Sequence, residues 1–166
     1  MPDRAAAQRP TLWPRCPQYK EFADGATQGC SATIEMPLAT ILIEDSTTIR
    51  ESLIPALAEL ANAEVIVVAE TAGEGIAALR THADRWQLAV VDMWLKEGNG
   101  LEVLQASLGR RSDQHMLVLT NYATPDIRQK SKAAGADAVF DKSTEIDLFF
   151  DLCKRYAAEQ GPLAGS

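Results

Sequence analysis

The sequence lacks the features that are typical of a secreted protein, a membrane protein or a protein stabilised by a structural metal. It has three cysteines, Cys16, Cys30 and Cys153, an odd number without metal-ligand spacing, which argues against a disulfide framework or a zinc site. Its apolar runs are far shorter than the ~20 residues of a membrane span, and no signal-peptide stretch follows the basic N-terminal residues. We therefore expect a cytoplasmic protein without a membrane partner.

Basic residues are also in the minority. Sixteen Lys and Arg stand against 23 Asp and Glu, which gives a formal net charge of −7 at pH 7. A chain this acidic lacks the diffuse attraction to a phosphate backbone, so we expect no direct contact with nucleic acid. Residues 1–37 hold four residues of each sign, which leaves 12 bases and 19 acids after them. The excess negative charge therefore lies entirely beyond residue 37.

Residues 1–37 differ from the rest in composition as well. They contain five of the eight prolines and show no sustained hydrophobic period, which indicates a flexible N-terminal extension. Because Met36 directly precedes the first strand-like run, a natural start at that residue is a further hypothesis. We predict one domain over residues 38–160 and a short C-terminal tail over residues 161–166.

From residue 38 onward, short apolar runs alternate with stretches of helical spacing. Near-continuous apolar runs are typical of strands covered on both faces of a parallel sheet. Ser46, Asn99, Thr124 and Ser143 are suitable helix caps. We predict a doubly wound, flavodoxin-like α/β domain with a five-stranded parallel sheet in the order 2-1-3-4-5 and helices on both faces. The predicted strands cover residues 38–43, 65–69, 88–91, 116–119 and 138–140.

The carboxyl ends of two predicted strands carry acidic side chains. The first strand ends in Glu44 and Asp45, and its neighbour in the sheet ends in Asp92. Adjacent strands lie ~4.8 Å apart, so these three carboxylates would repel one another unless a cation joins them. Mg²⁺ suits such a corner, because it binds few carboxylates and keeps several waters.

Two further side chains extend the same edge of the sheet. Thr120 ends the fourth strand, and Lys142 follows the fifth, where an extended lysine can approach Asp92. A carboxylate nucleophile, a divalent cation, a hydroxyl and an ammonium are the parts that phosphoryl transfer needs. Each residue alone would more often be a helix cap or a solvated surface group. Their joint placement at strand ends favours a phosphoryl-transfer site.

Four stretches of the chain carry a family resemblance. Together they make the segment from about Leu38 to Glu159 similar to the CheY-like receiver domain of bacterial two-component response regulators, a doubly wound fold. Gly100, eight residues after Asp92, also matches the family's turn before the third helix. The matching stretches are ILIEDS (41–46), LAVVDMWLKEGNG (88–100), MLVLTNYA (116–123) and GADAVFDKS (135–143).

The resemblance implies that Asp92 is the phosphoacceptor. It would receive a phosphoryl group from the phosphohistidine of a sensor histidine kinase or a histidine phosphotransfer protein, with Mg²⁺ as the cofactor. Such a domain promotes its own aspartyl phosphorylation and dephosphorylation without being a conventional enzyme. The implied residues are Asp45, Asp92 and the backbone carbonyl of Trp94 for the metal, Glu44 through a coordinated water, and Thr120 and Lys142 for the phosphoryl oxygens.

The chain departs from the family pattern at four positions. Lys96 and Ser143 stand where the family often has prolines, and Asn121 replaces a small residue after the threonine. The resemblance implies that Thr120 moves inward as a switch, and Val139 takes the place of the aromatic residue that is usually coupled to this threonine. These departures concern the entrance to Asp92 and the route by which a signal leaves it.

The resemblance places the output surface on the fourth helix, the fifth strand and the fifth helix. The predicted helix over residues 124–134 is weakly apolar, which suits an element that must shift. Phe150 is either a contact residue on this face or a residue that packs beneath the chain end. No output domain follows, so we predict a stand-alone, single-domain regulator that acts through a downstream protein target or a homodimer.

Two other functions are kept as alternatives. A receiver fold can act as a docking module without being phosphorylated. Separately, Gly73 and Gly75 belong to a G-x-G-x-x-A pattern with Asp92 19 positions after the first glycine, as in a dinucleotide-binding unit. Two points argue against this second alternative. Gly73 comes too late after the preceding apolar run to form a tight phosphate-binding turn. A dinucleotide-binding unit would also leave the reactive residues at the strand ends unexplained.

Overall fold

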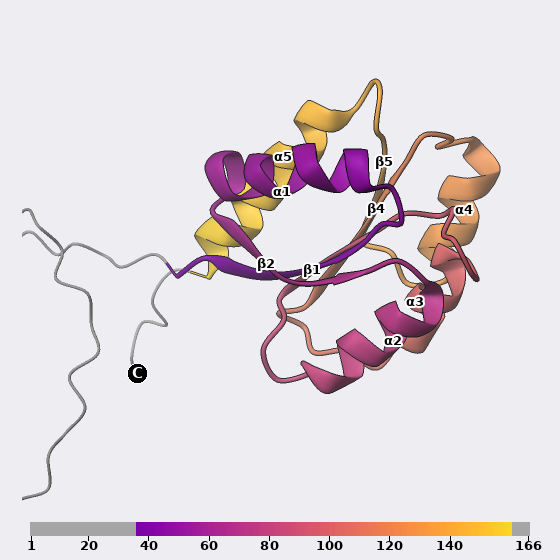
Figure 1. Ribbon diagram of the computed structural model, residues 1–166, viewed down its shortest axis with the longest axis horizontal. Coiled ribbons are helices and arrows are strands. Elements are labelled where there is room, and N and C mark those ends of the chain that lie inside the picture. The colour runs from indigo at the N-terminus through magenta and orange to yellow at the C-terminus, as the bar shows by residue number, and fades with distance from the viewer. Residues whose placement is uncertain (1–35, 161–166) are drawn as a thin grey trace, which may run out of the picture. The chain divides into compact units, whose positions relative to one another are not determined.

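The structure is a computed structural model that describes residues 36–160. The predicted N-terminal extension, apart from its last two residues, and the predicted tail lie outside the described residues. Strands and helices alternate along the described chain, as Figure 1 shows. The elements are β1 (Leu38–Ile43), α1 (Thr47–Ala61), β2 (Ala63–Ala69), α2 (Ala72–Thr81), β3 (Leu88–Val91), α3 (Gly100–Ala106), β4 (His115–Thr120), α4 (Pro125–Ala133), β5 (Ala138–Asp141) and α5 (Ile146–Glu159).

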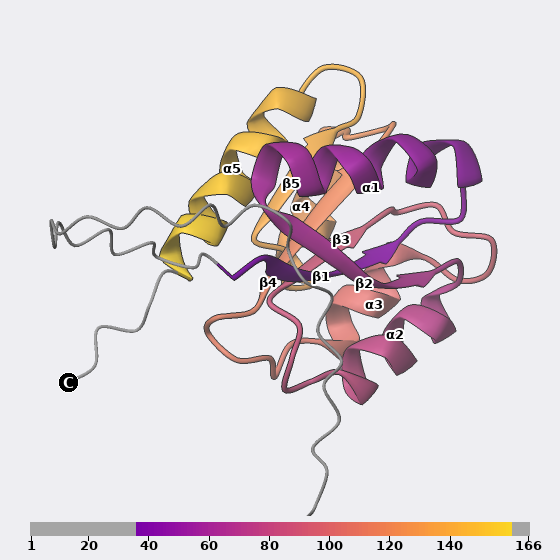
Figure 2. The same ribbon diagram turned by 60° about the vertical axis from the view of Figure 1, so that its left-hand side comes forward.

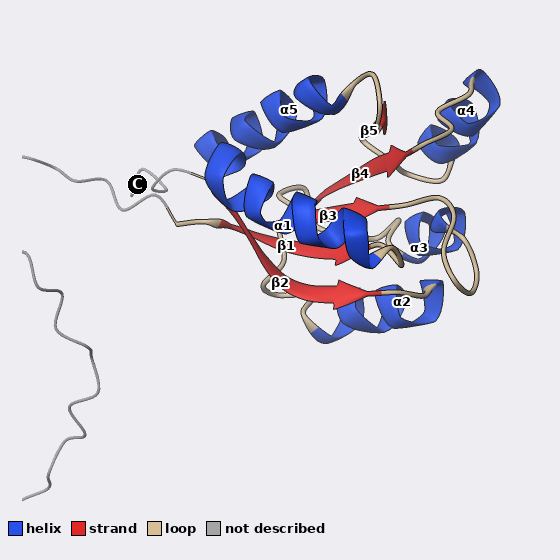
Figure 3. Cartoon of the chain, turned by 45° about the horizontal axis from the view of Figure 1, so that its top comes forward, coloured by secondary structure: helices blue, strands red, loops and turns tan. Residues whose placement is uncertain are grey.

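The strands form one parallel sheet in the order β2-β1-β3-β4-β5, which confirms the predicted fold class. Because all strands run in the same direction, their carboxyl ends meet at one edge of the sheet, as the arrows in Figure 3 show. The order reverses after β2, so β1 and β3 lie side by side at the switch point, where doubly wound folds usually hold their ligands.

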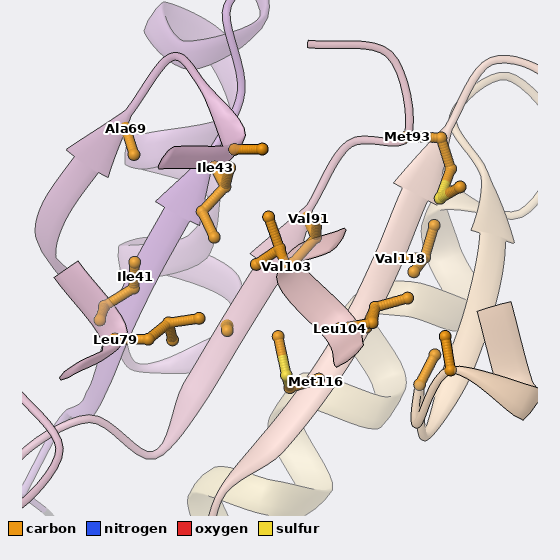
Figure 4. Close-up of a cluster of buried hydrophobic side chains, with 14 of the residues drawn as sticks. Ile41, Ile43, Ala69, Leu79, Val91, Met93, Val103, Leu104, Met116 and Val118 are labelled. Atoms are coloured by element: carbon orange, nitrogen blue, oxygen red, sulfur yellow. The ribbon is translucent and has the colours of Figure 1, made fainter. Parts of the chain in front are cut away.

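Two layers of helices cover the sheet. Successive strand residues point to opposite faces, so Leu38 and Leu42 of β1 pack in a cluster with α1 and α5. Ile41 and Ile43 of the same strand pack in a second cluster, under α2 and α3. Figure 4 shows this second cluster, with Leu79, Val103 and Leu104 among its residues, and Figure 2 shows α1 and α5 on the opposite side of the sheet.

Three of the four predicted helix caps are confirmed. The side chains of Ser46, Asn99 and Thr124 accept hydrogen bonds from backbone N–H groups in the first turns of α1, α3 and α4. The prediction for Ser143 is wrong, because α5 begins only at Ile146 and its N-cap residue makes no side-chain cap. Ser143 instead bonds through its hydroxyl and its N–H to the carboxylate of Asp141.

Helix α2 also differs from the sequence-based expectation. It begins at Ala72, so Gly73 and Gly75 lie in its first turns and not in a loop before it. Gly75 is buried, and a Cβ atom there would come within 2.9 Å of the Ile43 side chain. The absence of a side chain therefore serves helix–sheet packing, and no phosphate-binding turn is formed.

None of the helices between residues 36 and 160 is long and apolar enough to cross a membrane.

Candidate functional site

Three carboxylates converge at the carboxyl edge between β1 and β3. Glu44, Asp45 and Asp92 each offer an oxygen, and these oxygens all lie within 4.8 Å of one another. The strands place them there: the N–H of Glu44 donates to the carbonyl of Ala69 on β2, and that of Asp92 donates to the carbonyl of Ile43. The predicted meeting of the three side chains is confirmed.

Lys142, directly after the edge strand β5, completes the cluster. Its Nζ lies 2.6 Å from Oε2 of Glu44 and 3.1 Å from Oδ2 of Asp92. Its side chain is only 9% exposed, so water screens these contacts weakly. The extended lysine thus spans β5, β4 and β3 to reach the acidic corner, as the sequence predicted.

The site retains a surplus of negative charge despite this lysine. Burial raises the pKa of Glu44 above its ordinary value, and the hydrogen bond from Lys142 offsets part of that rise. Three carboxylates against one ammonium leave two negative charges uncompensated. Oxygen ligands with this charge and spacing suit a hard divalent cation such as Mg²⁺, so the residues present fit the predicted metal.

Thr120 lies at the end of β4, between the acidic corner and the lysine's strand. The residue is completely buried, and its hydroxyl accepts a hydrogen bond from the N–H of Tyr122 at 3.4 Å. Its carbonyl accepts the N–H of Lys142 at 2.9 Å. The ends of β4 and β5 are therefore bonded together where they present these two side chains.

The loop after β3 supports Asp92 and carries an exposed tryptophan. The N–H of Trp94 donates to Oδ1 of Asp92 at 3.4 Å, while the indole is exposed. A Cβ atom on Gly100 would lie 2.6 Å from the Asp92 carbonyl, so only glycine fits where α3 begins. Trp94 and Tyr122, 59% and 66% exposed, are the large exposed side chains nearest in sequence to Asp92 and Thr120.

The structure shows where three of the positions that depart from the family pattern lie. Lys96 is exposed, with its Nζ 4.0 Å from the carboxylate of Glu70. Asn121 lines a groove of about 340 Å³ between α1 and α5, together with Lys142. Val139 is buried in the sheet's core, so no aromatic ring occupies its place.

Phe150 is not a contact residue on the face of α4. It is buried, 8% exposed, and lines the same groove between α1 and α5. The structure therefore contradicts the first alternative; it shows Phe150 buried beside α1, and the chain end of the second alternative lies outside the described residues. The exposed apolar residue of α5 is Leu148, which is 58% exposed.

Sequence reasoning missed two arginines near the site. Arg50 of α1 donates from Nη1 to the carbonyl of Glu44 at 3.1 Å and to the carboxylate of Glu70 at 2.8 Å. Arg128 of α4 donates to two backbone carbonyls and to the carboxylate of Glu145.

Comparison with known proteins identifies the class that this fold and site define. The family model of the response regulator receiver domain matches residues 40–154. The chain therefore belongs to the response regulator receiver family of two-component signalling.

Its relatives include whole regulators and single receiver domains. The acid tolerance regulatory protein ActR of Rhizobium meliloti is 37% identical over 107 residues, 64% of this chain and 53% of that protein. DevR/DosR of Mycobacterium tuberculosis, a DNA-binding transcriptional activator, is 34% identical over 95 residues, 57% of this chain and 43% of that protein. The chain spans about half the length of these curated relatives.

Solved structures agree on the fold. The phosphorylated cyanobacterial phytochrome response regulator RcpA superimposes with a TM-score of 0.61 at 21% identity, over 78% of this chain and 99% of that one. An identity this low supports the shared architecture alone.

Proposed function

We propose that this receiver domain is a phosphorylation switch in which Asp92 accepts a phosphoryl group from the phosphohistidine of a histidine kinase or phosphotransfer protein. The observation that carries the proposal is the position of Lys142, whose ammonium lies within hydrogen-bonding distance of Asp92 inside a cluster of three carboxylates. A structural ion pair does not need two further carboxylates, and three buried or half-buried acids at one point are costly without a function.

The proposed reaction is a displacement at phosphorus. A carboxylate oxygen of Asp92 forms the new P–O bond, the P–N bond of the phosphohistidine breaks, and the departing imidazole keeps the bonding electrons. Lys142 supplies a fixed positive charge for a phosphoryl oxygen, and the Thr120 hydroxyl donates a hydrogen bond to another. Before transfer, the N–H of Trp94 orients the Asp92 carboxylate through Oδ1.

Receiver domains generally bind Mg²⁺, and Asp45, Asp92 and the Trp94 carbonyl would hold it here, with Glu44 acting through a coordinated water. When bound, the ion offsets the charge of the phosphoryl oxygens. The chain's own residues then have distinct tasks: Asp92 is the nucleophile, and Lys142 and Thr120 bind the transferred group.

The decisive experiment is incubation of the protein with acetyl phosphate and Mg²⁺, followed by intact-mass measurement. We expect a gain of one phosphoryl mass that disappears in Asp92→Asn. Asp84→Asn, which alters an exposed aspartate between α2 and β3, is the matched control and should retain the adduct. No adduct from acetyl phosphate or from any kinase would favour the alternative of a docking module that is not phosphorylated.

We further propose that phosphorylation alters the surface formed by α4, β5 and α5, and that this surface meets a downstream protein or a second copy of the chain. The proposed setting is the cytoplasm, with output through protein contacts and no direct contact with nucleic acid. Lys142→Ala should still accept phosphate, although more slowly, but fail to change this surface. An unchanged response of α4 amide signals to acetyl phosphate in that variant would refute the role.

A further inference from the structure

We infer that Arg128 is a positioning residue that holds the connection between β5 and α5, and with it Lys142, over Asp92. This inference rests on the proposed function, because it assigns Lys142 to the phosphoryl group. Arg128 lies on α4, outside the carboxylate cluster, so it would link the site directly to the helix on the proposed output surface.

The guanidinium of Arg128 bonds to three separate segments. Nε donates to the carbonyl of Ala123, in the loop after β4, at 2.9 Å, and Nη1 donates to the carbonyl of Val139 on β5 at 2.7 Å. Nη2 donates to Oε2 of Glu145, directly before α5, at 2.6 Å. One side chain thus joins α4 to the loop after β4, to β5 and to the residue directly before α5.

Glu145 passes this restraint on to the segment that carries Lys142. The same carboxylate oxygen, Oε2, accepts the N–H of Asp141 at 2.9 Å, and the N–H of Glu145 donates to the carbonyl of Asp141 at 2.9 Å. Lys142 follows Asp141 directly. The backbone from which the lysine extends is therefore closed into a turn by a carboxylate that Arg128 holds in place.

The chemistry of the pair suits a directional restraint. The Arg128 hydrogen bond is the main reason why the pKa of Glu145 is lowered, so the carboxylate is charged at neutral pH. Arginine spreads its donors over three nitrogens in a rigid plane, so its three acceptors can lie farther apart than those of the single nitrogen of a lysine. The side chains of Arg128 and Glu145 are 35% and 28% exposed, so water can reach the pair and the pair can be broken.

Helix α4 has little apolar packing beside the contacts of this residue. Its buried residue is Ser131, and Ile127 is its partly buried apolar contact with the core. The carbonyl that Arg128 grips belongs to Val139, the position at which the resemblance leads one to expect an aromatic switch residue. Arg128 thus provides a polar connection at a place where this chain has no aromatic ring.

The first test measures backbone hydrogen exchange at Asp141 by NMR in the unphosphorylated protein. In Arg128→Ala we expect at least about tenfold faster exchange of the Asp141 amide, since its acceptor is released. Arg128→Lys should give an intermediate rate. Lys130→Ala is the matched control, because Lys130 lies on the same helix but pairs only with the exposed Asp126 among the salt bridges between residues 36 and 160. Unchanged exchange in Arg128→Ala, or equal acceleration in Lys130→Ala, overturns the inference.

The second test measures the rate of phosphorylation by acetyl phosphate with Mg²⁺, at a temperature where every variant is folded by circular dichroism. A displaced Lys142 should slow Arg128→Ala by about tenfold, whereas a residue that only stabilises the fold would leave this rate unchanged. Faster exchange with an unchanged phosphorylation rate therefore also overturns the inference.

The two tests distinguish a failure of this inference from a failure of the proposed function. If the wild-type protein takes up no phosphoryl group, the proposed function fails by itself. The exchange of the Asp141 amide then still decides whether Arg128 holds the segment of Lys142.

Discussion

Helices α4 and α5 lie next to each other in the chain but are held by different forces. Helix α5 buries Phe149, Phe150 and Cys153 against the sheet and α1. Helix α4 buries only Ser131 among its described residues, and its firmest connections are the hydrogen bonds and ion pair of Arg128. One helix is fixed by apolar area and the other by a few directional contacts.

The difference matters for a switch. The free energy of apolar burial depends little on direction and is roughly proportional to the buried area. A small shift of α5 would therefore gain no stability, and a large shift would lose buried contact area. Directional hydrogen bonds can be broken and remade at modest cost, because each contributes only about 0.5–1.5 kcal/mol net. We therefore expect α4 to be the element that moves and α5 the element that remains in place.

The largest expected effect is the loss of an apolar contact under α5. Phe149 is completely buried, and its ring packs edge-on against those of Phe140 and Phe150. Phe149→Ala should lower the free energy of unfolding by about 3–5 kcal/mol, measured by urea denaturation. Leu148→Ala alters an exposed neighbour and should change it by less than about 0.5 kcal/mol. Equal losses in the two variants would contradict the role assigned to the buried face of α5.

A smaller effect is expected for the polar connection of α4. Arg128→Ala removes three hydrogen bonds. Ala123 and Glu145 are partly exposed and can bond to water instead, whereas Val139 is buried, so we expect a loss of about 1–2 kcal/mol in urea denaturation. A loss as large as that of Phe149→Ala would show that α4 and α5 unfold as one unit. Lys130→Ala, which removes an exposed pair on the same helix, should have almost no effect.

The polar connection of α4 should also make the stability of the protein depend on pH. Arg128 lowers the pKa of Glu145 from its ordinary value of 4.5. This ion pair therefore stabilises the folded state fully above about pH 4.5, and its contribution disappears as the pH falls through the lower folded-state pKa.

The measurement compares the wild-type protein with Glu145→Gln by urea denaturation at a series of pH values between 7 and 3. The stability difference between the two should shrink as the pH falls below 4.5. A difference that stays constant across this range would contradict the assignment of the shift to Glu145.

The smallest effect is expected at the centre of α4. The hydroxyl of Ser131 contacts the sulfur of Met93 at 3.6 Å, a weak acceptor. Ser131→Ala should therefore change the free energy of unfolding by less than about 1 kcal/mol, because neither partner is left with a strong unmet hydrogen bond. A loss above 2 kcal/mol by urea denaturation would mean that α4 is held by its buried centre and not by Arg128.

Much of the fold could be predicted because strand and helix signals are local. The apolar runs of β1 and β3 and the caps Ser46 and Asn99 lie where the structure has them. Local signals failed where tertiary contacts decide. Strand β2 begins two residues earlier than predicted because Ala63 and Glu64 pair with β1, and Ser143 is drawn to Asp141 instead of capping a helix.

The sequence by itself determined the set of acidic, hydroxyl and lysine residues at the carboxyl edge, because parallel strands in a doubly wound sheet bring their ends together regardless of side-chain detail. Only the tertiary structure decided how Lys142 bonds to both Glu44 and Asp92, and which arginine holds its backbone. These contacts join residues far apart in the chain, and no local pattern records which of several nearby acceptors a long side chain reaches.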